Sequence, residues 1–345
     1  MPVLVTGGAG YIGSHTVLEL VGRGEGVTVL DDLSTGFDWA VPEAAELVVG
    51  DVGDAAFVQR LLEERGITEI IHFAARSLVA ESVADPLGYY LGNIVKTRVL
   101  IQAAIKAGVM RLIFSSTASV YGEPRVEIIG EDEPTVPINP YGRSKLASEW
   151  MLEDAARAHG LAYTALRYFN VAGADPDGRS GQSSRIATHL IKVASQVAAG
   201  ARPGLEIYGT DYPTRDGTCI RDYIHVTDLA RAHVAALERL RAGGENLKVN
   251  CGYGRGYSVK EVVDVVKEVS GVDFPVTLSP RRPGDPACLV AGADRIRAEL
   301  GWQPALDDLP TIVRHAIEWE KSLVRRKAKD WPEPRLVPAT GGESI

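Results

Sequence analysis

The residues best suited to do chemistry are a tyrosine and a lysine four positions apart. Tyr141 and Lys145 open a segment with helical periodicity, and this spacing puts both side chains on one face of a helix. A tyrosine has a pKa of about 10 and is a poor base at neutral pH. A fixed ammonium group nearby favours the phenolate and lowers that pKa, so the pair could supply a general base. A surface tyrosine packed on a lysine stem is the competing interpretation.

A hydroxyl-rich segment supplies a third candidate. The strand-like residues 112–115 run into the sequence Ser115-Ser116-Thr117-Ala118-Ser119. A hydroxyl group there would stand at the carboxyl edge of a sheet, where open α/β sheets bind their ligands. A serine- and threonine-rich turn that caps a helix is the alternative. Together with the pair above, the segment favours a catalytic group made of Thr117, Tyr141 and Lys145.

A glycine turn could bind phosphate. Gly7, Gly10 and Gly13 follow the strand-like residues 3–6 and open a helical pattern. Such glycines allow a tight turn, a close approach of the backbone to a pyrophosphate, and close packing of helix on strand. The helix N-terminus then offers unpaired N–H groups to the phosphates. An ordinary glycine-rich turn is the alternative.

The context of the turn favours a dinucleotide. Asp31 ends the next strand-like run, about 20 residues after the last glycine, where an acid that binds the ribose belongs. Asp32 follows it, and two carboxylates would repel a 2′-phosphate. The sequence therefore predicts NAD rather than NADP as the cofactor.

The elements that must hold these residues alternate between strand and helix. Strand patterns cover residues 3–6, 27–31, 47–50, 69–73, 112–115 and 163–167, and helical patterns cover residues 13–23, 55–64, 93–107 and 141–159. This order indicates βαβ units and a parallel sheet. Nearly continuous apolar strands indicate a sheet covered on both faces. The predicted fold is an α/β Rossmann-type doubly wound parallel sheet with a smaller C-terminal α/β substrate lobe.

The alternation becomes irregular beyond about Gly173. Residues 175–181 and 209–217 have loop compositions; helices are expected at 188–199, 226–241, 258–270 and 307–321, and strands at 223–225 and 247–251. We expect an NAD-binding domain at residues 1–175, to which residues 218–250 return. Residues 176–217 and 251–330 would form the substrate lobe, and 331–345 a loose tail.

Whole-chain properties exclude several classes. The net charge is −8 without a basic stripe, which gives no case for nucleic acid or an anionic membrane. The basic run at residues 325–329 is interpreted as a solvated helix end. No transmembrane stretch or signal peptide is expected. Cys219, Cys251 and Cys288 match neither a disulfide framework nor a metal site. We therefore expect a cytoplasmic protein without a metal.

Beyond these motifs, the chain from Val3 to about Trp319 resembles the extended short-chain dehydrogenase/reductase family, and within it the UDP-galactose 4-epimerases. The more specific stretches are His72-Phe73-Ala74-Ala75, Glu81-Ser82-Val83, Pro86 with Tyr89-Tyr90, Arg167-Tyr168-Phe169-Asn170, Asp211-Tyr212-Pro213-Thr214, Arg221-Asp222-Tyr223-Ile224-His225-Val226 and Arg281-Arg282-Pro283-Gly284-Asp285.

The resemblance implies a site residue by residue. The residues expected to hold NAD are Gly7, Gly10, Tyr11, Ile12, Gly13, Asp31, Asp32, Leu33, Ser34, Thr35, Gly36, Asp51, Val52, Phe73, Ala74, Ala75, Ser77, Asn93, Ser115, Tyr141, Lys145 and Phe169. Those expected at the UDP-sugar are Thr117, Tyr141, Asn170, His189, Leu190, Tyr208, Arg221, Arg282 and Asp285. Arginine forks suit a diphosphate better than lysines do, although a lone arginine is more often a surface ion pair.

The implied reaction interconverts UDP-galactose and UDP-glucose through transient oxidation at the sugar C4. Tyr141 would take the proton of the 4-hydroxyl, Thr117 would hold that oxygen, and Lys145 would bind the nicotinamide ribose. The 4-keto sugar would turn over and be reduced on its other face, so NAD would be regenerated in each cycle and retained. The resemblance also implies a homodimer, with a helical contact through residues 93–107 and 141–159.

Some positions depart from the family pattern. Ser77 stands where many of these epimerases carry a lysine, and Thr117 replaces a commoner serine. His189 replaces an asparagine near the substrate, and a structural hydrogen bond is its alternative role. The position that limits N-acetylated sugars falls at Cys288 or Leu289, neither of which is a large aromatic residue. UDP-N-acetylhexosamines are therefore permitted.

Other activities remain open from the sequence. A 4,6-dehydratase would carry Asp-Glu directly after the threonine, whereas Ala118 and Ser119 follow Thr117. A decarboxylase, or an epimerase of UDP-pentoses or UDP-uronates, would share the UDP-binding residues. An NAD-sensing regulator without turnover is the alternative of another class, although such relatives usually lose the tyrosine or the lysine.

Overall fold

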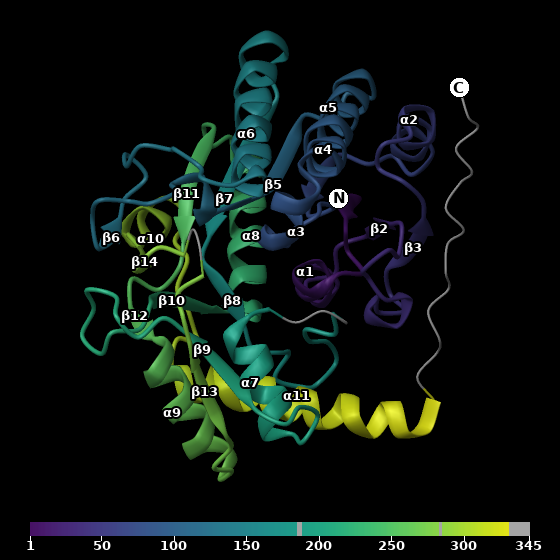
Figure 1. Ribbon diagram of the computed structural model, residues 1–345. Coiled ribbons are helices and arrows are strands. Elements are labelled where there is room, and N and C mark those ends of the chain that lie inside the picture. Colours follow the sequence, from purple (N-terminus) through teal and green to yellow (C-terminus); the bar gives the residue numbers. More distant parts are fainter. Residues whose placement is uncertain (185–187, 283–284, 331–345) are drawn as a thin grey trace, which may run out of the picture.

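The computed structural model describes residues 1–184, 188–282 and 285–330, and for residues 326–330 it describes the helical backbone alone. Its main sheet is parallel throughout, with strand order β11-β7-β5-β4-β1-β2-β3 (Figure 1). The strands are β1 (Val3–Thr6), β2 (Val27–Asp31), β3 (Glu46–Val49), β4 (Glu69–His72), β5 (Arg111–Thr117), β7 (Ala162–Tyr168) and β11 (Leu247–Cys251).

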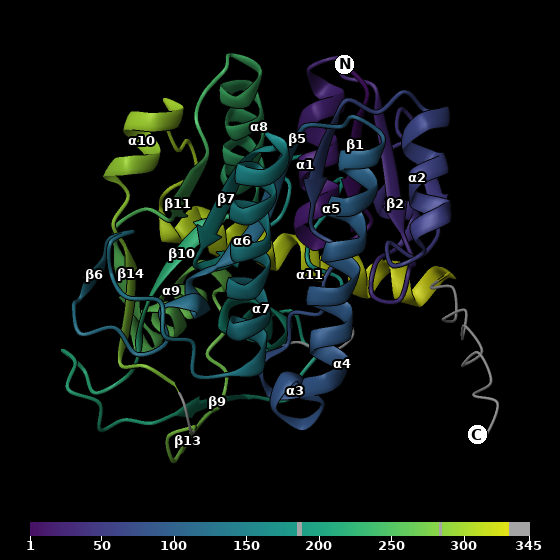
Figure 2. The ribbon, with the colours of Figure 1, turned by 90° about the horizontal axis from the view of Figure 1, so that it is seen from above.

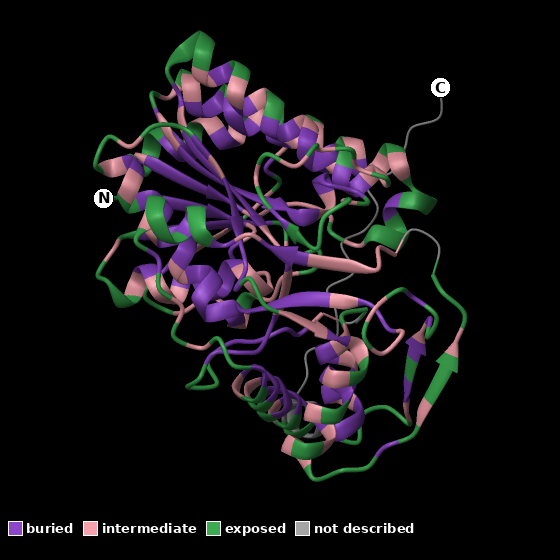
Figure 3. Ribbon diagram, turned by 90° about the vertical axis from the view of Figure 1, so that its left-hand side faces the viewer, coloured by how far each residue is buried: buried purple, intermediate pink, exposed green. Residues whose placement is uncertain are grey.

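Helices cover both faces of this sheet. Along β1, Val3 and Val5 pack in one core cluster with α1 (Tyr11–Gly22) and α8 (Val226–Arg241). Leu4 packs in a second cluster with helices on the other face, namely α2 (Ala55–Glu64), α5 (Lys96–Lys106) and α6 (Pro140–His159). The inner strands are accordingly buried along almost their whole length, whereas edge strand β3 is largely not (Figure 3). Burial on both faces explains their continuous apolar sequence.

The strand order reverses between β1 and β4. The chain passes from β1 through β2 to β3 on one side and continues with β4, β5 and β7 on the other. In doubly wound sheets the crevice at the carboxyl ends of such a pair is where a dinucleotide binds. The predicted fold class is confirmed, and the reversal places the glycine turn and the end of β4 at this crevice.

The C-terminal half adds smaller sheets and further helices beside the main sheet (Figure 2). β10 (Ile220–His225) pairs with β8 (Asn170–Ala172), β12 (Gly256–Ser258) and β14 (Cys288–Ala291), and β14 also pairs with β6 (Ile128–Ile129). A separate ladder joins β9 (Leu205–Tyr208) to β13 (Val276–Ser279). The helices of this region are α7 (Leu190–Ala198), α9 (Val259–Ser270), α10 (Asp294–Leu300) and α11 (Leu309–Asp330).

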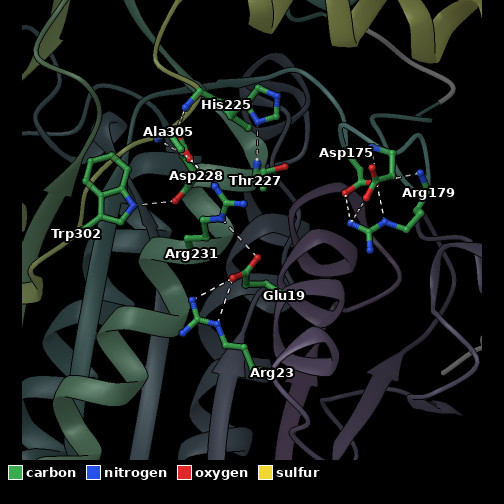
Figure 4. A network of polar contacts seen from close by, with 12 residues as sticks. Glu19, Arg23, Asp175, Arg179, His225, Thr227, Asp228, Arg231, Trp302 and Ala305 are labelled. Carbon is green, nitrogen blue, oxygen red and sulfur yellow. Dashed lines mark hydrogen bonds and ion pairs between the residues drawn. The ribbon is translucent and has the colours of Figure 1, made fainter.

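A buried carboxylate joins this half to α8 (Figure 4). Asp228 accepts hydrogen bonds from the backbone N–H groups of Ala305 and Leu306 and from the Tyr253 hydroxyl, and its own carbonyl accepts one from Trp302. On the same helix, the Arg231 Nε lies 3.6 Å from the Oε2 of Glu19 in α1. Through these contacts α8 links the segment before α11 to the helix that follows the glycine turn.

Most of the expected elements are present, and the differences lie in short ones. The helix expected from residue 93 begins at Lys96, after α4 (Pro86–Tyr90) and the π-helical turn η2 (Leu91–Val95). The sequence did not predict the strands β6, β8, β9, β12, β13 and β14 or the helices α3 (Val79–Ala84), α4 and α10. The predicted loose tail at 331–345, Pro283 and Gly284 of the arginine-rich stretch, and most side chains of the basic run lie outside the described residues. The proposed domain boundaries stay a prediction.

Within the described residues there is no helix long and apolar enough to cross a membrane.

Candidate functional site

The glycine turn lies at the carboxyl ends of β1 and β4. An added Cβ on Gly7 would come 2.6 Å from the Ala74 nitrogen, and one on Gly13 would come 2.2 Å from the Gly7 carbonyl oxygen. At Gly10, the N-cap of α1, only the Gly7 oxygen lies within 4 Å of an added Cβ, at 3.3 Å. The structure describes no side-chain cap there. The turn thus presents the first N–H groups of α1, which begins with Tyr11 and Ile12, to an anion.

The predicted ribose-binding acid is buried. Asp31 is 6% exposed and accepts hydrogen bonds from the backbone N–H groups of Ala9, at 3.0 Å, and Leu33, at 2.9 Å. Burial raises the pKa of Asp31, and these hydrogen bonds oppose the shift. A carboxylate has about four acceptor sites, so Asp31 keeps capacity for a ribose hydroxyl.

The residues after Asp31 form a turn against the glycine turn. Asp32 accepts hydrogen bonds from the backbone and hydroxyl of Ser34, and Leu33 has a positive φ of 57°. An added Cβ on Gly36 would lie 2.9 Å from the carbonyl carbon of Ala9. The predicted ribose loop, Asp31, Asp32, Leu33, Ser34, Thr35 and Gly36, is therefore in contact with the predicted phosphate turn.

The loop after β4 is held by Asn93. The Asn93 amide donates to the Arg76 carbonyl and the Ser144 hydroxyl, both at 3.0 Å, and accepts from the Arg76 N–H at 2.8 Å. Both amide hydrogens of this buried residue are thus used within the chain. Asn93 fixes the loop that contains Phe73, Ala74, Ala75 and the exposed Ser77, and its direct contact with a cofactor stays a prediction.

Two further residues that are expected to hold the cofactor lie just after β3. The Asp51 carboxylate accepts from Lys96, at 2.7 Å, and from the Gly53 N–H, at 2.7 Å. Val52 is buried in the core cluster shared by α2 and α5. Asp51 is therefore available at the surface beside the β2–β3 edge, whereas the Val52 side chain serves the core.

Tyr141 lies in the first turn of α6. Asn139 caps this helix by accepting from the Gly142 N–H at 2.8 Å, and Pro140 occupies its first turn. Thr117 ends β5 and also caps the short turn η3 (Ala118–Val120) by accepting from the Ser119 N–H at 3.1 Å. Tyr141 and Thr117 are each 7% exposed, and the Thr117 side chain favours the Tyr141 phenolate, since it opposes the rise in the Tyr141 pKa that burial causes. Thr117 thus serves as a turn cap and as a partner of the tyrosine.

Lys145 is almost completely buried one helical turn further. Its ammonium group donates to the Ser115 carbonyl at 2.8 Å and lies 4.9 Å from the centre of the Phe114 ring. Burial lowers the pKa of Lys145 to about 7, and the charge of Glu149 opposes that shift. Both partners belong to β5, so Lys145 lies beside the end of the neighbouring strand β4. The pKa of His72, at that end, is lowered mainly by burial and in addition by the positive charge of Lys145.

In the chain by itself the pKa of Tyr141 is raised, and its lowering with NAD bound stays a prediction. Burial raises the pKa of Tyr141, and the Thr117 side chain opposes the rise only in part. The physical reason is that the phenol is desolvated while the Lys145 ammonium donates to a backbone carbonyl.

Gly142 is a site residue that sequence reasoning missed. An added Cβ on Gly142 would lie 2.5 Å from the Ser119 carbonyl oxygen. The start of α6 therefore packs directly on η3, which brings Tyr141 to Thr117. The glycine beside Tyr141 was visible in the sequence, but no local signal indicated which backbone it would approach.

A buried ion pair anchors α6 to the sheet, and it too was missed. Glu149, one turn beyond Lys145, accepts from Arg167 of β7 at 2.6 and 3.0 Å and from the Ser116 hydroxyl at 2.5 Å. Arg167 also donates to Tyr121 at 3.0 Å. Spacing of four residues from Tyr141 to Lys145 to Glu149 puts all three on one helix face, and this spacing was the available signal.

The end of β7 completes this region. The hydroxyls of Tyr168 and Ser115 lie 2.6 Å apart, so Ser115 uses both its carbonyl and its hydroxyl within the chain. Phe169 is 8% exposed and packs in a cluster with Ala118 and Leu146. Asn170 begins β8, opposite Tyr223 of β10.

The predicted UDP-sugar residues of the C-terminal half form two pairs. Arg221 donates to Asp285 at 2.7 Å and to its own strand at the Ile220 carbonyl. The Arg282 guanidinium lies 3.6 Å from the centre of the Tyr208 ring. Each pair joins side chains that lie far apart in the sequence, and each contains an arginine, whose guanidinium group can bind a phosphate.

His189 and Leu190 lie at the start of α7. His189 is the N-cap residue, without a side-chain cap hydrogen bond, and its Nδ1 accepts from the Gln182 amide at 3.0 Å. Leu190, the first residue of the helix, packs against the core. The structure therefore shows the structural hydrogen bond that was the alternative for His189, and substrate contact stays a prediction.

Comparison with known proteins agrees with this geometry. The NAD dependent epimerase/dehydratase family matches residues 3–252. A UDP-glucose 4-epimerase of Azospirillum brasilense is 57% identical over 93% of this chain and 92% of the relative. The crystal structure of UDP-glucose 4-epimerase from Brucella ovis in complex with NAD is 48% identical, with a TM-score of 0.90 over 93% of this chain and 98% of that chain.

A third comparison is with a protein that is named for two UDP-sugars. The UDP-Glc/GlcNAc 4-epimerase from Campylobacter jejuni is 48% identical, with a TM-score of 0.82 over 93% of this chain and 99% of that chain. The resemblance inferred from the motifs is confirmed. This chain belongs to the NAD dependent epimerase/dehydratase family.

Proposed function

We propose that the protein is an NAD-dependent UDP-hexose 4-epimerase, an isomerase that interconverts UDP-galactose and UDP-glucose. The observation that carries the proposal is the buried group of Thr117, Tyr141 and Lys145, in which the start of α6 packs on the turn that follows Thr117 and Lys145 lies one turn along the same helix. The sheet order puts this group, at the end of β5, beside the end of β4 and hence beside the glycine turn. The similarity to named UDP-glucose 4-epimerases supports it.

The residues of the crevice fit NAD. The uncapped start of α1 suits the pyrophosphate, and Asp31 suits a ribose hydroxyl. When bound, NAD supplies the redox chemistry at the sugar C4 and a positive charge near Tyr141. The remaining NAD-binding residues are those that the sequence predicts, with Asn93 and Ser115 acting through the segments that they hold.

The chain's own residues move the proton. The Tyr141 oxygen accepts the proton of the sugar 4-hydroxyl, and the Thr117 hydroxyl holds the reacting oxygen in place. Lys145 supplies positive charge next to this site, and Glu149 favours that charge because it raises the pKa of Lys145. Burial of the group excludes water, which strengthens each of these interactions.

The C-terminal half would hold the UDP-sugar. Arg221 and Arg282 would bind the diphosphate as forks, while Asp285 and Tyr208, their present partners, would be released or shared. Asn170, His189 and Leu190 would line the sugar side. This arrangement keeps the substrate tethered through UDP while the sugar changes orientation.

NMR of the purified protein with UDP-galactose and no added NAD tests this function. Appearance of UDP-glucose is the expected result, and it would also show that NAD copurifies. If no UDP-glucose forms even after NAD is supplied, the hexose assignment is wrong, and UDP-xylose and UDP-glucuronate become the next substrates to assay.

A second substrate class is supported by the residues at the start of β14. Cys288 and Leu289 are partly buried, and neither is a large aromatic residue. We expect turnover of UDP-GlcNAc as well, in line with the Campylobacter jejuni relative. Cys288→Tyr and Leu289→Tyr should each be assayed with both sugars. Selective loss of UDP-GlcNAc turnover in one of them would support the assignment, and equal rates with both sugars in both variants would contradict it.

A homodimer is supported by an apolar stripe on one side of the molecule. Val83, Leu87, Leu91 and Val95 recur every four residues along α3, α4 and η2, and Leu87 is 76% exposed. Trp150, on the neighbouring α6, is 57% exposed. Such a patch is typical of a protein interface. Light scattering should give twice the chain mass, and Leu87→Glu should reduce it to the monomer.

We also propose a cytoplasmic location. Cys219, Cys251 and Cys288 are all free thiols, which suits a reducing compartment.

A further inference from the structure

We propose that Trp319 of α11, acting through Trp39, clamps the two segments that enclose the cofactor turn, and thereby controls how long NAD stays bound. The inference rests on the proposed NAD-dependent function and adds positioning residues that lie outside the predicted site. Neither tryptophan belongs to the set expected to touch the cofactor, so each would act through the loops that do.

The first of the two segments is the ribose loop and its continuation. Gly36 packs on Ala9 of the glycine turn, and the Phe37 N–H donates to the Ala9 carbonyl at 3.0 Å. The chain then forms the short turn η1 (Asp38–Ala40), in which the Trp39 ring lies 5.2 Å from the Phe37 ring. Any movement of Trp39 would therefore be transmitted to the residues that hold the ribose and to the phosphate turn.

The second segment is the loop from Gly173 to Ser183, which is bonded to α1. The Tyr11 hydroxyl donates to the Gly173 carbonyl at 2.7 Å, and the hydroxyls of Ser14 and Ser180 lie 2.7 Å apart. The ion pair of Asp175 with Arg179, at 2.7 Å, stiffens the loop between these two contacts (Figure 4). The segment is thus fastened to the first turns of α1, whose N-terminus faces the pyrophosphate.

Trp319 is in contact with both segments. Its ring centre lies 6.1 Å from that of Trp39. On its other side it meets Gly181, where an added Cβ would lie 2.5 Å from the indole, and it packs with Ala174 and Leu323 in one small cluster. Trp319 is only 3% exposed, so this position is enclosed. One side chain thus contacts the segment that continues from the ribose loop and the loop that is bonded to the first turns of α1.

The clamp belongs to the C-terminal half of the molecule. Helix α11 packs on α7 and α9 of that half and runs beneath α1 towards β2, as two perpendicular views agree (Figures 1 and 2). Glu320, next to Trp319, forms a buried ion pair with Lys192 of α7. Because α11 is fixed to the substrate half, opening of the cofactor loops requires separation of the indole rings. Slow release of NAD is the consequence, and it suits an enzyme that regenerates its cofactor in each cycle.

The test measures the release of radiolabelled NAD from the holoenzyme during a chase with excess unlabelled NAD. Trp39→Ala should release label about tenfold faster, the change expected from loss of one aromatic contact, and Trp39→Phe should stay near the wild-type rate. The rate of epimerisation at saturating NAD should change little in both, because the catalytic group is untouched.

A comparison of two equally buried tryptophans distinguishes loss of the clamp from a general loss of stability. Trp302 is as buried as Trp319, at 3%, but stacks on Tyr253 away from the cofactor loops. Trp319→Phe should speed release of NAD, whereas Trp302→Phe should not. Equal release from both, or a wild-type rate in folded Trp39→Ala, would overturn the proposal. Failure of the wild-type protein to bind labelled NAD at all would instead refute the proposed function.

Discussion

The two halves of the site hold their polar side chains in different ways. Tyr141, Thr117 and Lys145 are at most 7% exposed, and Thr117 and Lys145 are bound to the backbone of neighbouring turns and strands. In the substrate half, Arg282 is exposed and stacks on Tyr208, and Arg221 pairs with Asp285, whose side chain is 38% exposed. The group proposed to transfer the proton is therefore fixed within the chain, whereas the group proposed to bind UDP can exchange partners.

Removal of the Tyr141 hydroxyl should have the largest effect. Tyr141→Phe should lower kcat by about 10²–10⁴-fold, the range for loss of a general base. The melting temperature should change little because the ring still fills its site. Tyr257→Phe in β12, which lies outside the predicted site, is the matched control and should keep full activity. Near-normal turnover by Tyr141→Phe would remove Tyr141 from the mechanism.

Acid should destabilise the fold through its buried histidines. Burial lowers the pKa of His15 and His233 to about 4 and that of His72 and His225 to about 3. The unfolded chain therefore binds more protons below pH 6.5. Stability is fully present above that pH and is lost as the pH falls towards 4, by roughly 1 kcal/mol per histidine per pH unit.

Buried carboxylates oppose this trend, since burial raises the pKa of Asp31 as well as that of Asp222. Burial raises the pKa of Asp222 to about 6, so its protonation favours the folded state as the pH falls below that value. Denaturant titrations at pH 7.5, 6.5 and 5.5 measure the balance. A free energy of unfolding that stays constant across this range would contradict the neutral, buried state of the four histidines.

Gly142 offers a way to separate Tyr141 from Thr117 without altering either. Gly142→Ala should cost about 1–3 kcal/mol through overpacking against Ser119, although alanine is the better helix former by about 1 kcal/mol. We expect lower stability and a lower kcat. Gly22→Ala, at the end of α1, meets nothing within 4 Å and should be neutral or stabilising. A stabilised, fully active Gly142→Ala would show that the close approach is unimportant.

The smallest expected effect lies in the exchangeable half. Arg282→Ala should raise KM for UDP-galactose by about tenfold, the value of one charge-assisted contact, and leave kcat nearly unchanged. Arg281→Ala is the control, because Arg281 pairs with Asp211 and stacks on Tyr212 instead. A fall in kcat without a change in KM would mean that the two halves are not as distinct as their contacts indicate.

The main sheet and its long helices could be predicted because each carries a local pattern. The short strands could not, since β9 pairs with β13 and β6 with β14 across long stretches of sequence. The burial of Thr117, Tyr141 and Lys145 near one another agrees with the group predicted from their type and spacing, while their catalytic roles stay a prediction. The hydrogen-bond partners of Asn93 and Ser115 could not be predicted from the sequence, because these bonds depend on tertiary packing. The raised pKa of Tyr141 could not be predicted either, because it follows from burial.

The contact between Trp39 and Trp319 also has a consequence for biosynthesis. A ribosome adds about 5–20 residues per second, so roughly 15–55 s separate the synthesis of these two side chains. The nucleotide-binding βαβ unit emerges long before the indole that closes it. A nascent chain can therefore assemble most of its cofactor crevice early, yet it can lock NAD in place only when the helix that carries Trp319 has left the ribosome.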